Sequence, residues 1–288
     1  MTQADIRRVT VEAAHVTSVS TVRRAIRTPE VGVGHSLTGM RAAGLIARCA
    51  TVEDALSAAS RWMLASRRSE WVYKNAIANQ LLLQRHGLDN AAIINELKIG
   101  TSVADCVIVN GRATVYEIKS ELDNPAKLLK QLRDYRTAFK RVVLVTHQSL
   151  LAAYGELLVD EPVGLVSMNS RGRLRTVRAP VDHTDDLAIG AMMKTLRRSE
   201  FLRIAEQIAG EAIDVPATAL FRRCLDISRS VSDVDYCRLH EQELRKRKAR
   251  AGAALGDKRF EDARHQLLTI NPTSAQLEKL ADWMSRRA

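Results

Sequence analysis

The chain has 288 residues, of which 46% are hydrophobic and 27% are charged, the balance of a soluble globular protein. It contains no run near the roughly 18 apolar residues of a membrane span, no apolar signal segment and no CxxC pair, which argues against membrane association and structural zinc and favours a cytoplasmic protein. Its formal net charge of +11 favours a polyanionic partner, because Lys and Arg release condensed counterions from phosphates.

Residues 1–65 are predicted to form a helical N-terminal region. Apolar residues recur at helical spacing between Met40 and Ala65. Thr51 and Asp54 have the spacing of a capping box at the start of a helix. No residue of this region carries a chemistry that the sequence identifies.

Residues 66–182 alternate between helical and strand patterns. Asn110–Gly111 is a strong turn signal between two strands, and Asn124–Pro125 is typical of the start of a helix. The expected elements are a helix over 69–86, strands over 91–99, 103–109 and 113–120, a helix over 124–140, a strand over 141–147, a helix over 149–158 and a hairpin over 163–180. This order predicts an α/β (α+β) core with a mixed sheet.

Residues 183–288 return to helical patterns and are predicted to form a helical C-terminal region. The expected helices lie over 186–210, 217–230, 233–252, 257–270 and 273–287. The basic run "RKRKAR" at 245–250 leaves two interpretations open. It is either a solvated helix face or a surface that binds the backbone of a nucleic acid.

Three charged residues interrupt the apolar runs of the expected strands. Glu117 and Lys119 lie two apart in "VYEIK", so their side chains point to the same face of the strand. Asp105 interrupts "VADCVIV" on the preceding strand, where aspartate is disfavoured. An ordinary half-solvated strand is the alternative interpretation, and it accounts poorly for Asp105.

The register of this hairpin decides whether Asp105 meets Glu117. A two-residue loop would pair Val109 with Arg112 and would set Asp105 on the wrong face. A loop of three residues pairs Val109 with Ala113 and sets Asp105 opposite Glu117. We predict the second register, in which the two carboxylates share a face, since a slip by one residue moves every side chain to the other face.

Two carboxylates held close together repel unless a cation lies between them. Hard oxygen ligands suit Mg²⁺ or Mn²⁺, which could bind a scissile phosphate and lower the pKa of a bound water. Lys119 could orient that water or neutralise charge that develops on the phosphate. Together, Asp105, Glu117 and Lys119 predict a metal-dependent phosphodiester hydrolase.

The pattern formed by Asp105, Glu117 and Lys119 resembles the core of the PD-(D/E)XK nuclease superfamily, and the expected element order resembles its αβββαβ fold. Ala104 stands at the position where Pro gives that superfamily its name. Downstream, "QLRDY" resembles the QxxxY motif of the RecB-like and phage-exonuclease branch. The segment is also similar to an uncharacterised bacterial, partly phage-associated family with this core.

The resemblance implies a metal site and indicates which residues would be its ligands. Asp105 and Glu117 would be ligands of Mg²⁺ or Mn²⁺, with the carbonyl of Ile118 as a third ligand. Glu70, on the upstream helix, would be an additional metal or water ligand, although an ordinary residue of a helix N-terminus is an equal alternative. Glu96, at the end of the first strand, is a competing acid.

The resemblance also implies roles for three other polar side chains. Lys119 would be the catalytic lysine, and Gln131 and Tyr135 would orient it or contact a phosphate. Their spacing of four puts Gln131 and Tyr135 on one helical face, as in any amphipathic helix. Lys74 would face the same cleft as Glu70. His147 is expected to be a polar residue at a strand end.

The sequence therefore predicts a metal-dependent nuclease over residues 66–182, with DNA preferred over RNA by the resemblance alone. Two alternatives stay open. One is a catalytically silent nuclease-fold protein that binds nucleic acid as a scaffold. The other is a helical protein–protein adaptor, in which the flanking helices would bind a protein partner or a second copy of the chain.

Overall fold

The computed structural model describes residues 1–30, 32–33, 37–66, 69–121 and 123–288. The chain forms two compact units, each built from separate segments. The first unit contains Met1–Asp89, Met168–Leu174 and Ala249–Ala288, and the second contains Asn90–Ser167 and Arg175–Lys248. The predicted α+β fold is confirmed.

A six-stranded sheet in the order β1-β2-β3-β4-β5-β6 forms the centre of the second unit. Its strands are β1 (Ala92–Ile99), β2 (Ser102–Asn110), β3 (Arg112–Lys119), β4 (Arg141–His147), β5 (Val163–Met168) and β6 (Leu174–Arg178). The first three strands are antiparallel and β3 pairs with β4 in parallel, so the sheet is mixed, as predicted.

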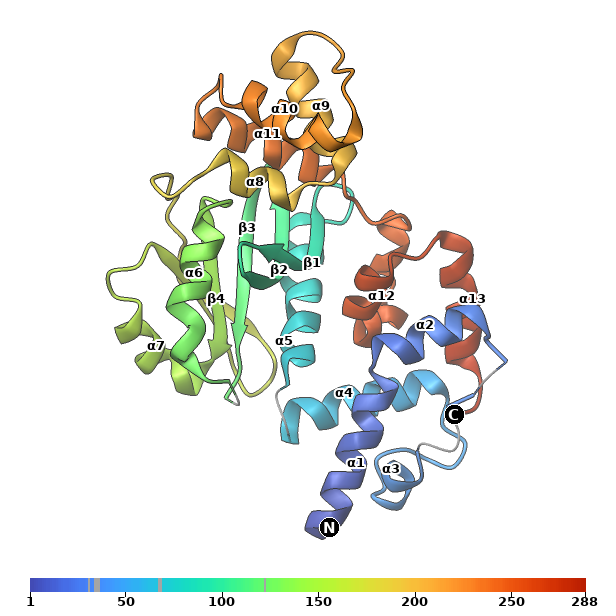
Figure 1. Cartoon of the computed structure of the whole chain (residues 1–288). Helices are drawn as coiled ribbons and strands as arrows, with labels where there is room; N and C mark the ends of the chain where they lie inside the picture. The colour runs from blue at the N-terminus through green and yellow to red at the C-terminus, as the bar shows by residue number, and fades with distance from the viewer. Residues whose placement is uncertain (31, 34–36, 67–68, 122) are drawn as a thin grey trace. The chain divides into compact units, whose positions relative to one another are not determined.

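Helices surround this sheet and share a core with it (Figure 1). They are η3 (Pro125–Lys127), α6 (Leu128–Arg136), η4 (Gln148–Leu150), α7 (Leu151–Leu157), α8 (Ile189–Thr195), α9 (Arg198–Ala209), α10 (Ala217–Ser228) and α11 (Asp233–Arg245). Leu128, Leu132 and Tyr135 of α6 join the same buried cluster as Val107 and Val115 of the sheet. The face of β2 and β3 that carries these valines therefore faces α6.

Side-chain hydrogen bonds position helix α6 and the short helix η3 that precedes it. Asn124 is a helix cap, as predicted, but it caps η3: its side chain accepts a hydrogen bond from the N–H of Ala126 at 2.9 Å. Near the end of α6, the carboxylate of Asp134 accepts hydrogen bonds from the hydroxyls of Thr101 at 2.9 Å and Ser102 at 2.7 Å. These contacts tie α6 to the β1–β2 turn and set which of its side chains reach the sheet.

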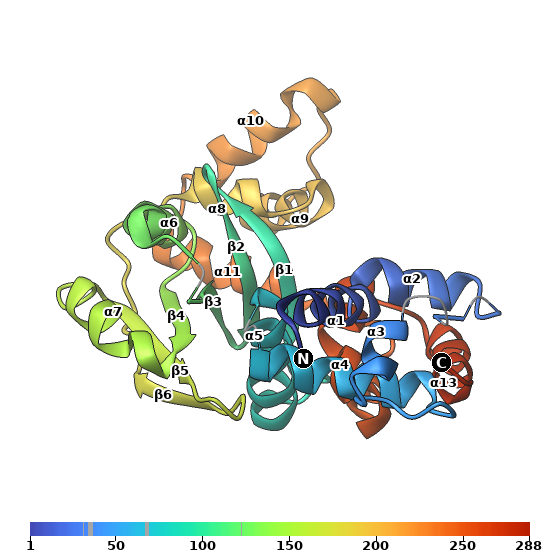
Figure 2. The ribbon, with the colours of Figure 1, turned by 90° about the horizontal axis from the view of Figure 1, so that it is seen from below.

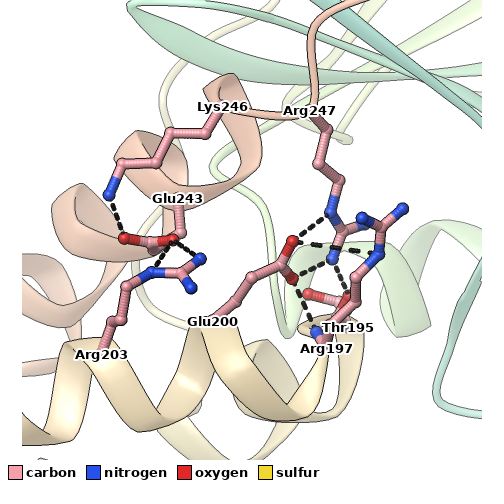
Figure 3. A network of polar contacts seen from close by, with 7 residues as sticks. All are labelled: Thr195, Arg197, Glu200, Arg203, Glu243, Lys246 and Arg247. Atoms are coloured by element: carbon pink, nitrogen blue, oxygen red, sulfur yellow. Dashed lines mark hydrogen bonds and ion pairs between the residues drawn. The ribbon is translucent and has the colours of Figure 1, made fainter.

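The single helix expected over 186–210 is two helices. It breaks because the carboxylate of Glu200 accepts a hydrogen bond from the N–H of Arg197 at 2.6 Å, which starts α9 with a new cap. The helix expected over 233–252 ends earlier, at Arg245. Two members of the basic run form ion pairs within the protein: Lys246, which is exposed, binds Glu243, and Arg247 binds Glu200 (Figure 3).

The first unit is helical. Its elements are α1 (Gln3–Val16), α2 (Val19–Arg27), α3 (Thr38–Ala42), α4 (Val52–Ser66), α5 (Glu70–Ala76), η2 (Ile77–His86), η5 (Gly252–Gly256), η6 (Lys258–Ala263), α12 (Arg264–Ile270) and α13 (Ser274–Ser285). Helix α1 lies beside α3 and α4 (Figures 1 and 2). The predicted capping box at the start of α4 is confirmed, since the N–H of Asp54 donates to the hydroxyl of Thr51 at 3.1 Å and the N–H of Thr51 donates to Asp54 at 2.8 Å.

The two ends of the chain fold together in this unit. The amide of Gln266 donates to the carbonyl of Thr17 at 2.7 Å, and the N–H of Val52 donates to the carbonyl of Arg286 at 2.9 Å. The helices after residue 248 therefore complete the N-terminal helices, whereas α8 and α11 pack on the sheet and α9 and α10 pack on those two helices. In the described part of the chain, no helix has the length and apolar character needed to cross a bilayer.

Candidate functional site

The register of the β2–β3 hairpin is the one predicted. Val109 pairs with Ala113, and Cys106 pairs with Tyr116. Continued by one residue, this register sets Asp105 of β2 opposite the residue after Tyr116, which is Glu117. Directly opposite residues of an antiparallel pair carry their side chains on the same face.

Asp105 contacts β3 next to Glu117. One oxygen of its carboxylate, Oδ2, accepts a hydrogen bond from the backbone N–H of Ile118 at 2.6 Å. Asp105 is half-buried, whereas its neighbours Ala104 and Cys106 are buried. The carboxylate of Asp105 thus contacts the backbone of β3 at the residue that follows Glu117.

Glu117 is the centre of the site. Only 2% of its surface is exposed, and its carboxylate accepts three hydrogen bonds from side chains. Lys119 Nζ and Gln131 Nε2 each donate to Oε1 at 2.7 Å, and the hydroxyl of Tyr135 donates to Oε2 at 2.7 Å. Since burial of a polar group without partners is costly, these three donors compensate the carboxylate of Glu117 for its lost contact with water.

Lys119 is held on two sides. Its Nζ donates to Glu117 at 2.7 Å and to Gln131 Oε1 at 2.9 Å, so Lys119, Glu117 and Gln131 form a closed ring of hydrogen bonds. The hydroxyl of Thr146 on β4 donates to the backbone carbonyl of Lys119 at 2.7 Å. Both the backbone and the side chain of Lys119 are therefore fixed.

Tyr135 links α6 to both strands. Its hydroxyl lies 2.8 Å from the carbonyl of Val103 on β2 and 2.7 Å from Glu117 on β3. Burial raises the pKa of Tyr135, and the nearby negative charges of Glu117 and Asp105 raise that pKa further. The hydroxyl therefore stays protonated and acts as a donor to Glu117. The charge of Asp105 acts on Tyr135, which agrees with Asp105 lying on the α6 face.

We expect Tyr135→Phe to lower the free energy of unfolding by about 1–3 kcal/mol, because it leaves a buried carboxylate oxygen of Glu117 without its donor. Denaturation with urea measures this loss. Tyr154→Phe is the matched control, since Tyr154 is also buried but its hydroxyl makes no hydrogen bond to a described residue. Equal stability of the two variants would contradict the role assigned to Tyr135.

Glu96 of β1 lies in line with Asp105 and Glu117 across the sheet. Asn95 pairs with Cys106 and Leu97 pairs with Ala104, so Glu96 is opposite Asp105. The backbone of Glu96 has a φ of +54°, in the left-handed region that residues other than glycine rarely adopt. Three acids on neighbouring strands, Glu96, Asp105 and Glu117, are therefore aligned across β1, β2 and β3.

At the position of Glu96 and Asp105, the alternation of core-facing side chains along β1 and β2 shifts by one residue. Side chains that face one core alternate with a period of two along a regular strand. Here Ile94 and Leu97 of β1, three residues apart, both contact the core, as do Ala104 and Val107 of β2. This shift coincides with the left-handed backbone of Glu96 and with the position of Asp105 opposite it.

Glu70 and Lys74 belong to α5, in the first unit. They form an ion pair with each other at 2.5 Å, in which Lys74 is buried and Glu70 is exposed. The hydrogen bonds that connect the other predicted site residues lie entirely within the second unit. The role implied for Glu70 as an additional ligand thus stays a prediction.

His147, at the end of β4, is a polar residue at a strand end, as expected. Its Nδ1 lies 2.8 Å from the hydroxyl of Ser149 and 3.2 Å from Glu121 Oε1. The N–H of Ser149 also donates to this nitrogen at 3.3 Å, so His147 caps the turn that starts η4. These contacts give His147 a structural role.

The donor set suits a hard divalent cation. Within the described ranges, no group of three or more His, Cys, Asp and Glu side chains is arranged to hold a metal ion. Asp105 and Glu117 supply two carboxylates, and the carbonyl of Ile118 would be a backbone donor beside them. A carboxylate offers about four lone-pair positions, and Glu117 uses three of them. An ion such as Mg²⁺, which keeps several waters when bound, would use the fourth position.

Comparison with known proteins places these residues in a phage family. The family model described as bacteriophage P4 protein cII matches residues 63–251, more than half of the chain and the whole range from Glu70 to Tyr135. The chain belongs to the bacteriophage P4 protein cII family. The phage association that the sequence predicted is thereby confirmed, whereas no PD-(D/E)XK nuclease family is shown.

One curated member of the family is similar over a shorter segment. Protein cII of Enterobacteria phage P4 is 30% identical over 103 residues, which is 35% of this chain and 35% of that protein. The chain thus aligns with about a third of the length of this relative. No solved structure matches.

Proposed function

We propose that this cII-family protein is a metal-dependent nuclease whose active site lies between β2, β3 and α6 of the second unit. The observation that supports the proposal is the contact of Asp105 with β3 beside Glu117, in a network that also contains Lys119, Gln131 and Tyr135. Asp105, Glu117 and Lys119 were predicted from their chemistry and spacing, and Gln131 and Tyr135 from the resemblance to the QxxxY motif. An ordinary half-solvated strand gives no reason for them to meet.

In this proposal, Asp105, Glu117 and the carbonyl of Ile118 hold Mg²⁺ or Mn²⁺. The ion would supply Lewis acidity toward a phosphodiester and a template for the attacking water. The protein supplies the fixed geometry, because Glu117 is anchored by Gln131 and Tyr135. A carboxylate anchored in this way keeps its orientation when a charged substrate arrives.

Lys119 stabilises negative charge on the phosphate. An ammonium has three protons, and two of those on Nζ are donated to Glu117 and Gln131. The third is available for an oxygen of the scissile phosphate. Since Gln131 orients the ammonium without touching substrate, Gln131 is a positioning residue for Lys119.

Cleavage assays test this proposal. The full chain is incubated with linear, circular and single-stranded DNA and with RNA, in Mg²⁺, in Mn²⁺ and in EDTA. We expect hydrolysis of at least one DNA form with either metal and none in EDTA. Intact DNA and RNA under every condition would contradict the proposal.

One observation favours a second candidate, a catalytically silent nuclease-fold protein that binds nucleic acid as a scaffold. Glu117 receives three protein donors, a number that also suits a purely structural carboxylate. This candidate predicts salt-sensitive binding of DNA without cleavage in Mg²⁺ or Mn²⁺. The same panel of substrates, with a binding measurement added, distinguishes the two candidates.

A further inference from the structure

A cavity of about 200 Å³ lies within the first unit, apart from the proposed nuclease site. Its wall contains apolar, amide, acidic and basic side chains from α4, α5, η2, η6 and the loop between β5 and β6. The lining residues used below are Trp71, Asn79, Arg171, Arg173, Glu261 and Asp262.

The cavity is built on a π-helix. Helix η2 has this form over ten residues, Ile77–His86, whereas π-helical segments are usually single turns and are frequent at functional sites. Hydrogen bonds from residue i to i+5 mean that side chains four and five apart share a face. Asn79, Gln80 and Gln84 have these spacings, and all three line the cavity.

The loop that carries the two arginines is fixed against η2. The amide of Gln80 donates to the carbonyl of Gly172 at 2.7 Å and accepts from the N–H of Leu174 at 3.0 Å. Gly172 has a φ of +73° and packs against Leu64 so closely that a Cβ would lie 3.3 Å from that side chain. The N–H groups of Arg171 and Arg173 both donate to the side chain of Asn169, at 2.9 and 3.0 Å.

The side chains of Arg171 and Arg173 are available for a ligand. Both residues are exposed, and neither guanidinium makes a hydrogen bond or ion pair with any residue that the structure describes. The loop thus holds two guanidiniums at one cavity with no carboxylate partner. Guanidinium groups are suited to bidentate contacts with phosphate.

Two buried polar atoms at the cavity have no protein partner. The indole N–H of Trp71 and the side-chain oxygen of Asn79 make no hydrogen bond in the described part of the chain. Asn79 is 9% exposed, and its other polar atom, Nδ2, donates to the carbonyl of Glu261 at 3.0 Å. A ligand that satisfies both atoms must present an acceptor to Trp71 and a donor to Asn79.

The size of the cavity limits its occupant. Cavities that enclose drug-sized ligands measure roughly 300–1,000 Å³, so one of about 200 Å³ holds part of a ligand. A planar group with donors and acceptors on its edge fits beside an indole, and its phosphate would lie outside at the exposed arginines. We propose that this cavity binds one unpaired nucleotide, with its base inside and its phosphate on Arg171 and Arg173.

The acidic residues of the wall define the preferred base. Asp262 accepts a hydrogen bond from the hydroxyl of Ser57 at 2.7 Å, and Glu261 is exposed. Together with Asn79, these groups provide acceptors, so a base with an exocyclic amino group is favoured over thymine. A surface that bound phosphate alone would not place two carboxyl groups at the same cavity.

Binding of nucleoside monophosphates to the full chain tests the proposal. Titration calorimetry is carried out in EDTA with dAMP, dCMP, dGMP, dTMP and inorganic phosphate. We expect saturable binding at one site per chain, with dTMP and phosphate weaker than the others by about fivefold or more. The metal-dependent site does not act in EDTA, so the outcome is independent of whether the protein is a nuclease.

Substitutions assign this binding to the cavity. The double variant Arg171→Gln/Arg173→Gln should bind about tenfold more weakly, because hydrogen bonds to a charged group are lost. Arg85→Gln is the matched control, since Arg85 is an exposed arginine of η2 that does not line the cavity. Trp71→Phe keeps an aromatic ring without the N–H and should weaken the binding of each base while leaving its salt dependence unchanged.

Three outcomes would overturn the proposal. One is no saturable binding of any nucleotide up to about 1 mM. Another is equal affinity of the double variant and Arg85→Gln. The third is affinity for inorganic phosphate equal to that for the nucleotides, which would show that no base is bound.

Discussion

Glu117→Gln should slow metal-dependent cleavage by at least about a hundredfold, and Lys119→Ala should do so as well. Glutamine keeps the shape of Glu117 but removes the charge that would hold the ion. It also presents an amide NH₂ to groups that are themselves donors, Lys119, Gln131 and Tyr135. Initial rates on the most rapidly cleaved DNA form, in saturating Mg²⁺, measure both effects.

The controls separate catalysis from folding. Glu156 is an exposed glutamate on α7 of the same unit, and Glu156→Gln should cleave at the parent rate. Circular dichroism and the thermal midpoint show whether Glu117→Gln remains folded. If a folded Glu117→Gln protein cleaves as fast as Glu156→Gln, the site assignment is wrong.

The variant Glu96→Gln tests whether Glu96 belongs to the proposed metal site together with Asp105 and Glu117. The sequence offered Glu96 only as a competing acid, and the structure aligns it with Asp105. A loss of cleavage confined to Glu117→Gln and Asp105→Asn would support the two-carboxylate site. A loss in Glu96→Gln of similar size would add the third strand to that site.

The register of the β2–β3 hairpin could be predicted from the charged side chains of its strands, but not from the sequence of its turn. Asn110–Gly111 alone favours a two-residue loop, which would separate Asp105 from Glu117. In the structure, Asn110 pairs with Arg112 and Gly111 takes a φ of +70°, a conformation that glycine tolerates. The requirement that two strand carboxylates share a face therefore predicted the register better than the turn type did.

The backbone irregularities could not be predicted from local patterns. Glu96 adopts a left-handed conformation within β1, although the sequence around it is compatible with a regular strand. The π-helix after Ala76 has the composition of an ordinary α-helix. The cavity beside it also needs Arg171 and Arg173, whose loop is placed by tertiary contacts with Gln80.

The basic run at 245–250 shows that a cluster of charges in the sequence does not reveal which of them are paired in the folded protein. Its density of Lys and Arg is compatible with a surface for nucleic acid. The partner of Arg247, Glu200, lies 47 residues earlier in the chain, so no local pattern reveals the pair. Figure 3 shows Arg247 directed into a network with Glu200 and the carbonyl of Thr195, which gives this arginine a structural role.

Arg247→Met should lower the free energy of unfolding by about 3–5 kcal/mol. The guanidinium of Arg247 binds both oxygens of Glu200, at 2.9 and 2.5 Å, and the two side chains are only 10% and 6% exposed. Removing the cation leaves a buried carboxylate without its main partner. Lys246→Gln is the control, because the side chain of Lys246 is 61% exposed and exposed pairs contribute at most about 1 kcal/mol.

The double variant Glu200→Gln/Arg247→Met separates loss of the pair from loss of one charge. Once both charges are absent, no buried charge is uncompensated, so the double variant should be more stable than Arg247→Met alone. Urea denaturation of the parent, both single variants and the double variant completes the cycle. A double variant less stable than Arg247→Met would mean that the pair is not the source of the stability.

The contribution of Glu200 to the free energy of unfolding should change with pH in a predictable direction. Burial raises the pKa of Glu200, but hydrogen bonds from Arg247 and from the N–H of Arg197 outweigh it, so the pKa lies below the ordinary value of 4.5. A carboxyl group with a lowered pKa in the folded state stabilises the protein above its unfolded pKa and loses that contribution as the pH falls. The difference in stability between the parent and Glu200→Gln should therefore be full at pH 7 and should shrink below about pH 4.5. A difference that grows toward acid would mean that the pKa of Glu200 is raised in the folded state, so that burial outweighs the hydrogen bonds from Arg247 and Arg197.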